Sequence, residues 1–104
     1  MSFDAQELSV LAYANGFTHW HYRTRDDLDQ LLGARGEGDG HGGAYFAAAR
    51  EVLRPGDQIT VNLLTPGAVG LAQLAVIQLP ETGAPRLALL AATPPPLRSL
   101  AAAA

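Results

Sequence analysis

The sequence contains GAYFAAAREVLRPGDQITVN at residues 43–62, a helix-type pattern, a turn and a strand-type pattern in direct succession. The first part predicts an amphipathic helix over about 44–54, and the members of its apolar stripe are Tyr45, Phe46, Ala49, Val52 and Leu53. Pro55-Gly56-Asp57 predicts a chain reversal, because proline disfavours helical geometry in the residue before it. The alternation over 58–64 is typical of a half-buried strand. None of these residues forms a recognisable catalytic motif.

Composition narrows the classes of protein that the chain can belong to. With 104 residues it has the length of one domain, which we assign to 1–92, followed by an extended Pro/Ala-rich tail at 93–104. The net charge is −3 and the seven basic residues are scattered arginines, so we expect no nucleic-acid partner. No signal-peptide pattern is visible, and the apolar run at 68–79 is interrupted and too short to cross a bilayer. We therefore expect no membrane partner either.

The N-terminal segment, residues 4–14, leaves two alternatives open. Asp4 with Glu7 resembles a helix capping box, and Gly16 would then end that helix. Asn15-Gly16 is instead the favoured two-residue turn of a β-hairpin, and we prefer this alternative. The cross-strand pairs of the predicted hairpin are Leu11 with Trp20 and Tyr13 with Thr18.

The rest of the chain adds one short helix, a loop and two strands. A helix over about 26–32 is predicted to end at Gly33, and the glycine-rich stretch 33–43 is a loop by composition. Residues 71–79 are apolar on both faces, which indicates a central strand or one covered by another subunit. A last strand is expected at 86–92. The predicted fold class is therefore α+β, a small mainly antiparallel sheet with the helix at about 44–54 and this second short helix.

Histidines and glycines suggest metal or phosphate chemistry, which we do not expect here. His19 and His21 share one strand face, and Asp39 and His41 could approach them, but a glycine-rich loop does not pre-organise a closed metal site. The loop also lacks the Gly-Lys-Ser/Thr ending of a phosphate-binding loop.

Acidic residues and serines do not indicate catalysis either. Asp26, Asp27 and Asp29 fit a helix start, where carboxylates cap the backbone and interact favourably with the helix dipole. The serines lack the context of a nucleophile elbow. We therefore assign no catalytic, cofactor-binding or metal-binding residue, expect no cofactor, and do not expect an enzyme.

Two spaced patterns carry a resemblance. They are Phe17-x-x-Trp20-x-Tyr22-x-Thr24-x-Asp26 and Tyr45-Phe46-x-x-Ala49-x-x-x-Leu53-x-x-Gly56-Asp57-x-Ile59-x-Val61-Asn62. Together they cover residues 17–62 and resemble a family of short virion proteins encoded by tailed phages and by gene transfer agents, most closely the head-spike base proteins of gene transfer agents. The glycine-rich loop at 33–43 is longer than this family leads us to expect.

The resemblance implies a non-enzymatic virion protein, made in the bacterial cytoplasm, that decorates capsid vertices. Its expected partners are a capsid protein, a spike or fibre protein, and further copies of itself, with a pentamer expected at a vertex. A small acidic domain without a groove binds through sheet faces, edges or arms, which points to the apolar strand and the tail. The expected contact residues are Leu71, Gln73, Ala75, Ile77, Pro94, Pro95, Pro96, Leu97 and Arg98.

Two other functions are alternatives. A carbohydrate-binding or host-adhesion module of a phage-like particle would present Trp20, Tyr22 and Tyr45 for stacking on a sugar or a partner. In a chain with so few aromatic residues, we expect Trp20 and Tyr22 to belong to the core instead. An unrelated small enzyme or regulator is the other alternative.

Overall fold

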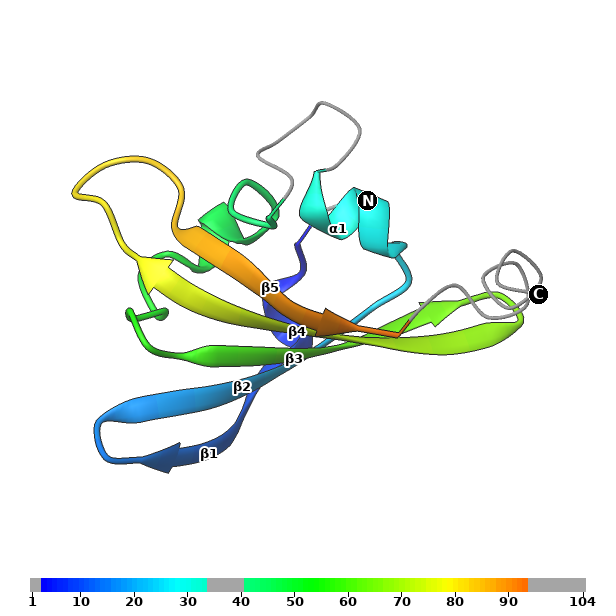
Figure 1. Ribbon diagram of the computed structural model, residues 1–104, viewed down its shortest axis with the longest axis horizontal. Helices are drawn as coiled ribbons and strands as arrows, with labels where there is room; N and C mark the ends of the chain where they lie inside the picture. The colour runs from blue at the N-terminus through cyan, green and yellow to red at the C-terminus, as the bar shows by residue number, and fades with distance from the viewer. Residues whose placement is uncertain (1–2, 34–40, 94–104) are drawn as a thin grey trace.

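The computed structural model describes residues 3–33 and 41–93, which form one five-stranded sheet with short helical segments on one side (Figure 1). The segments in chain order are η1 (Ala5–Glu7), β1 (Leu8–Ala14), β2 (Phe17–Thr24), α1 (Leu28–Leu32), η2 (Tyr45–Ala49), β3 (Gln58–Thr65), β4 (Ala68–Gln78) and β5 (Arg86–Ala92). The strands lie side by side in sequence order. The chain is thus a small α+β, mostly β protein, as its pattern predicts.

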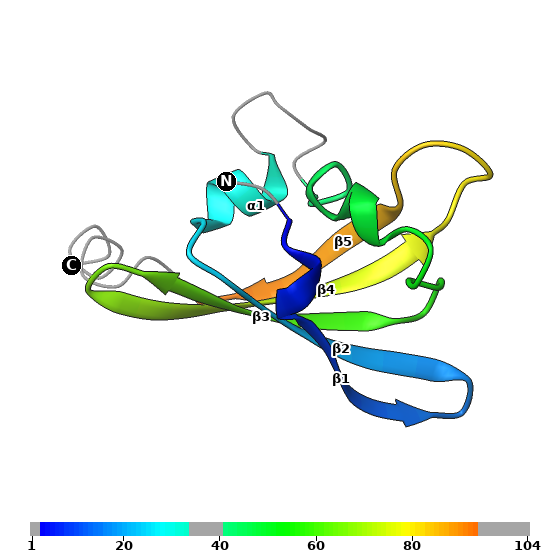
Figure 2. The ribbon, with the colours of Figure 1, turned by 180° about the vertical axis from the view of Figure 1, so that it is seen from behind.

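The sheet is mixed, because β2 and β3 are parallel whereas the other neighbouring strands are antiparallel. Parallel neighbours need a long crossover connection. Here the connection runs through residues 25–57 and carries α1 and η2 over one face of the sheet (Figures 1 and 2). That face is consequently covered, whereas no helical segment of residues 3–33 and 41–93 covers the opposite one.

The N-terminal hairpin is present, with a different register from the predicted one. Asn15 and Gly16 both have positive φ, at 55° and 84°, as a two-residue hairpin turn of the I′ type requires. Tyr13 lies opposite Thr18 as predicted, but Val10 and not Leu11 lies opposite Trp20. The register shifts at Leu11, where a β-bulge places one extra residue in β1. The helical alternative survives only as the single 3₁₀ turn η1, whose N-cap is Asp4.

The predicted second helix is present as α1. Asp27 accepts a hydrogen bond from the backbone N–H of Gln30, whose side chain in turn accepts one from the Asp27 N–H. This reciprocal capping box starts the helix, and Gly33 in the left-handed conformation ends it. Leu31 and Leu32, the last two residues of α1, are buried.

The predicted helix over 44–54 is wrong in type and extent. Only Tyr45–Ala49 is helical, as the 3₁₀ segment η2, and turns follow it up to Val52. Ala44 has no side chain that could cap the backbone, whereas α1, which is equally short, begins with a capping box. Val52 and Leu53 follow the 3₁₀ segment, and there Val52 is exposed whereas Leu53 is buried.

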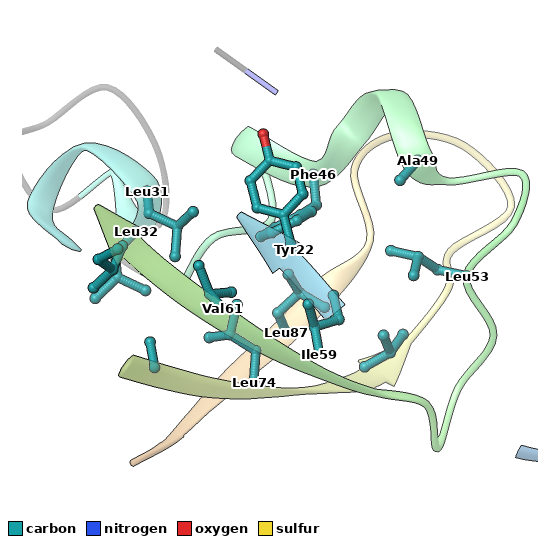
Figure 3. Packing of buried hydrophobic residues seen from close by; sticks show 13 residues of the cluster. Tyr22, Leu31, Leu32, Phe46, Ala49, Leu53, Ile59, Val61, Leu74 and Leu87 are labelled. Carbon is teal, nitrogen blue, oxygen red and sulfur yellow. The ribbon is translucent and has the colours of Figure 1, made fainter. Parts of the chain in front are cut away.

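The core lies between the sheet and the covering segments (Figure 3). Its side chains come from β2, β3, β4, β5, α1 and the 46–53 region, and they point toward one another. The buried members are Tyr22, Leu31, Leu32, Phe46, Ala49, Leu53, Ile59, Val61, Leu63, Ala72, Leu74, Val76 and Leu87. The core therefore lies on one face of the single sheet, beneath the helical segments.

The C-terminal limit of the sheet lies one residue beyond β5. The Thr93 N–H donates to the Leu71 carbonyl at 2.8 Å, and the Leu71 N–H donates to the Thr93 hydroxyl at 3.0 Å. Thr93, assigned to the tail from sequence, is therefore fixed to β4. The remaining tail positions, including Pro94 to Arg98, lie outside the described residues. Within the part of the chain that the structure describes, no helix has the length and apolar character needed to cross a membrane.

Candidate functional site

The uncovered side of the sheet, here called the open face, displays the docking residues predicted on β4. Ala72, Leu74 and Val76 are buried on the covered side. Strand alternation directs the residues between them to the opposite side. The predicted contacts Leu71, Gln73 and Ala75 therefore share the open face, where Leu71 is exposed, and Ile77 is exposed next to them at a register irregularity of β4. None of the helical segments in ranges 3–33 and 41–93 lies over this face (Figure 2).

Polar side chains occupy the middle of the open face. The imidazole Nε2 of His19 lies 2.7 Å from the Thr60 hydroxyl, and the Gln73 amide donates to the Gln58 side-chain carbonyl at 2.8 Å. These hydrogen bonds tie β2 to β3 and β3 to β4 through side chains. The face thus combines a hydrogen-bonded polar centre with exposed aliphatic residues on β4.

The two edge strands carry further exposed apolar side chains, which the sequence analysis did not single out. They are Val10, Leu11 and Tyr13 on β1, and Leu89 and Leu90 on β5. Every residue of β1 after Leu8 is exposed. A usable signal was present, because LSVLAYA is apolar on both strand faces in the same way as residues 71–79.

Hydroxyl groups and one carboxylate form a cluster where η1, β2 and η2 meet. The Tyr45 hydroxyl donates to Asp26 Oδ2 at 2.6 Å and lies 3.1 Å from the Tyr22 hydroxyl. Tyr22 in turn accepts the Asp4 N–H at 2.8 Å. Burial and then the hydrogen bond to Asp26 raise the pKa of Tyr45 well above its ordinary value. This phenol therefore keeps its proton and donates a hydrogen bond to Asp26.

A pocket of about 430 Å³ lies beside this cluster. The residues that line it are Asp4, Glu7, Tyr22, Arg23, Thr24, Arg25, Asp26 and Leu64. Both signs of charge are present, and Arg23 is already bonded to Glu7 at 2.8 Å. The lining therefore does not favour one ligand class.

Asp57 is the most deeply buried charged residue of the described chain, at 1% exposure. Its carboxylate accepts three N–H groups: the Thr18 backbone at 2.9 Å, the Trp20 indole at 3.0 Å and the Arg54 backbone at 3.1 Å. These bonds join the start of β2 to the start of β3. The arrangement is structural, because each donor belongs to the protein itself.

The aromatic residues proposed for stacking are engaged inside the fold. Tyr22 is buried in the core as expected, with Phe3 stacked on its ring at 5.2 Å between centroids, so it is not presented for stacking on a sugar or a partner. Trp20 and Tyr45 are partly buried, and their polar atoms are bonded to Asp57 and Asp26. Tyr13 is the exposed tyrosine instead.

The candidate metal ligands do not converge within the described residues. There, no group of three or more His, Cys, Asp or Glu side chains is placed to hold a metal ion. His19 and His21 lie on β2, Asp39 lies outside the described residues, and His41 is exposed between α1 and η2. Of the acidic residues at the helix start, Asp27 caps α1 and Asp26 bonds to Tyr45.

Comparison of the chain with family models, with curated proteins and with solved structures gives no match.

Proposed function

We propose that this chain is a non-enzymatic structural protein of a phage-like particle. In this proposal it forms a homo-oligomer at capsid vertices, expected to be a pentamer, and connects the capsid protein to a spike or fibre protein. The spacing of residues 17–62 suggests the class of protein. The observation that carries the proposal is the open face, which presents Leu71 and Ile77 without cover from the described chain.

Exposed aliphatic residues on a flat sheet fit a docking surface better than a ligand site. A small-molecule site is normally concave and buries most of its ligand. A protein partner can instead cover a flat face, gaining from each apolar side chain removed from water. The polar centre of the open face would then supply hydrogen bonds within such an interface.

Particle incorporation tests the docking role. The double variant Leu71→Asp/Ile77→Asp places two charges on the open face and should lower co-purification with particles at least ten-fold. Val52→Asp is the matched control, because Val52 is comparably exposed but lies outside the sheet. Circular dichroism is used to check that each variant folds. Undiminished incorporation of the double variant would contradict docking through this face.

The predicted tail contact needs a separate variant. Deletion of residues 94–104 leaves Thr93 and its hydrogen bonds to Leu71 in place, so the domain should keep its thermal stability. We expect weaker incorporation of this variant into particles. Full incorporation would exclude the tail as a contact element while leaving the open face as a candidate.

A further inference from the structure

We infer that copies of this chain associate by pairing the outer edge of β5 in one copy with the outer edge of β1 in the next. Strand order leaves β1 and β5 as the two edges of the described sheet. An edge strand presents a row of backbone N–H and C=O groups that lack a strand partner. Each edge is seven residues long, so the two can match along their whole length.

Each edge carries one irregularity, at Leu11 or Leu90, but little charge and no proline that would block pairing. Proteins commonly block exposed edges with lysine, proline or inward-pointing charges. β1 contains no charged residue and no proline, and β5 contains only Arg86, at its first position. The chain has a net charge of −3, so copies repel at a distance, but two nearly neutral edges can approach. A second copy is therefore the partner that fits each edge.

Strand direction favours this pairing. β2 runs antiparallel to β1, β3 runs parallel to β2, β4 runs antiparallel to β3, and β5 runs antiparallel to β4. β1 and β5 therefore run in opposite directions. A rotation about an axis along the strands preserves strand direction from copy to copy. β5 of one copy then runs antiparallel to β1 of the next, which is the slightly more stable arrangement.

Register gives an independent argument. Full overlap in antiparallel orientation places Ser9 opposite Ala91 and Ala12 opposite Ala88. Both members of each pair lie on the open face, because their neighbours within the sheet are His21, Gln73, His19 and Ala75. The pleats of the two edges therefore continue each other without a shift.

The exposed apolar residues of the two edges come together in this register. The overlap places Leu11 opposite Leu89 and Val10 opposite Leu90, so the irregularities at Leu11 and Leu90 lie on adjacent pairs near its centre. The exposed residues brought together there are Val10 at 57%, Leu11 at 55%, Leu89 at 37% and Leu90 at 54%. The contact therefore gathers these four aliphatic side chains at its centre, with the two bulges offset by one residue pair.

Interface size sets the expected strength. One seven-residue edge is smaller than the roughly 20–30 residues per partner of a standard interface, so a single contact should be weak. The contact is heterologous, since different edges meet, and it closes into a ring or continues as a filament. Ring closure makes each copy bind twice, which strengthens a weak contact. The inference rests on one part of the proposed function, which is that copies of this chain associate with one another.

Cysteine cross-linking tests the pairing directly, because the chain contains no native cysteine. Ser9→Cys and Ala91→Cys are purified separately, mixed, and oxidised at high protein concentration. The mixture should give cross-linked dimers, whereas either variant alone should give none. The double variant should give a ladder whose longest product reports the ring size. Dimers from Ser9→Cys alone would mean that β1 pairs with itself and would overturn the inference.

Analytical ultracentrifugation of the 104-residue chain, without any introduced cysteine, gives the second measurement. Leu11→Lys or Leu90→Lys should raise the dissociation constant of self-association at least ten-fold, whereas Val69→Lys, at a still more exposed position on β4, should not. Association that resists both edge variants would overturn the inference and leave the docking role standing. A double-cysteine ladder together with absence from particles would support the inference and contradict the proposed function.

Discussion

The two faces of β4 differ in how far their side chains are buried. Leu74 is 0% exposed beneath the covering segments, whereas Leu71, three residues earlier, is 46% exposed on the open face. On the covered half, no buried side-chain nitrogen or oxygen of the described residues lacks a hydrogen-bond partner. On the open face, aliphatic side chains remain in water. Strand alternation alone separates the residues that fold the chain from those available to a partner.

The largest expected effect tests the covered half at Asp57. Asp57→Ala removes both carboxylate oxygens, which together accept three N–H groups. Because these donors lose their partner, we expect a loss of about 3–6 kcal/mol in the free energy of unfolding. Asp57→Asn keeps one acceptor oxygen and should cost less. Urea denaturation measures both, with Glu81→Ala as the exposed control. A small loss for Asp57→Ala would show that the start of β3 is held by something else.

A matched pair of leucines on β4 tests the division itself. Leu74→Ala should cost about 2–5 kcal/mol, because it leaves a cavity in a packed core. Leu71→Ala removes the same atoms from the open face and should change stability by less than about 0.5 kcal/mol. The same denaturation experiment compares them. Equal losses would mean that the open face contributes to folding, and the separation of roles would fail.

Local signals in the sequence were sufficient for most elements of the fold. The turn at Asn15-Gly16, the helix start at Asp27 and the approximate positions of β3 and β5 follow from short-range signals of glycine, asparagine, aspartate and proline. The parallel pairing of β2 with β3 could not be predicted this way, because it depends on where a 33-residue connection returns. The 3₁₀ form of η2 likewise depends on tertiary packing and not on the apolar stripe.

The docking role of the β4 residues stays a prediction. Leu71 and Ile77, which the sequence named as contacts, are exposed on that strand. The exposed apolar side chains of β1 were missed, although LSVLAYA is apolar on both strand faces; the edge position of β1 depends on the order of the strands and is not visible in this pattern. Tyr22 was assigned two alternative roles, and only the covering by Phe3 and Tyr45 decides between them.

A smaller effect is expected at Tyr45, whose hydroxyl meets Asp26, Tyr22 and Thr24. Tyr45→Phe should cost about 1–2 kcal/mol at neutral pH, because buried groups lose a hydrogen-bond partner. Tyr13→Phe, at an exposed position, is the control and should leave stability unchanged.

Alkaline pH gives this cluster a distinct readout. The fold raises the pKa of Tyr45 above its ordinary value of 10.0, so the unfolded chain releases this proton first. The stabilisation is therefore complete below about pH 10 and is lost as pH rises above it. Tyr45→Phe should show a shallower alkaline decline than the parent protein. An identical decline would mean that this phenol ionises equally easily in the folded state.

The smallest expected effect concerns Arg23, which follows the buried Tyr22 on β2 but points to the other side. Its Nε donates to Glu7 Oε1 at 2.8 Å, and this hydrogen bond lowers the pKa of Glu7. A lowered pKa stabilises the fold above the ordinary value of 4.5 and loses that effect as pH falls. Because both side chains are exposed, water and salt screen the pair, and Glu7→Gln should not move the urea midpoint measurably. If Glu7→Gln destabilised the protein as much as Tyr45→Phe, solvent-exposed polar contacts would share in holding the fold, and the contrast between the two sides of the sheet would break down.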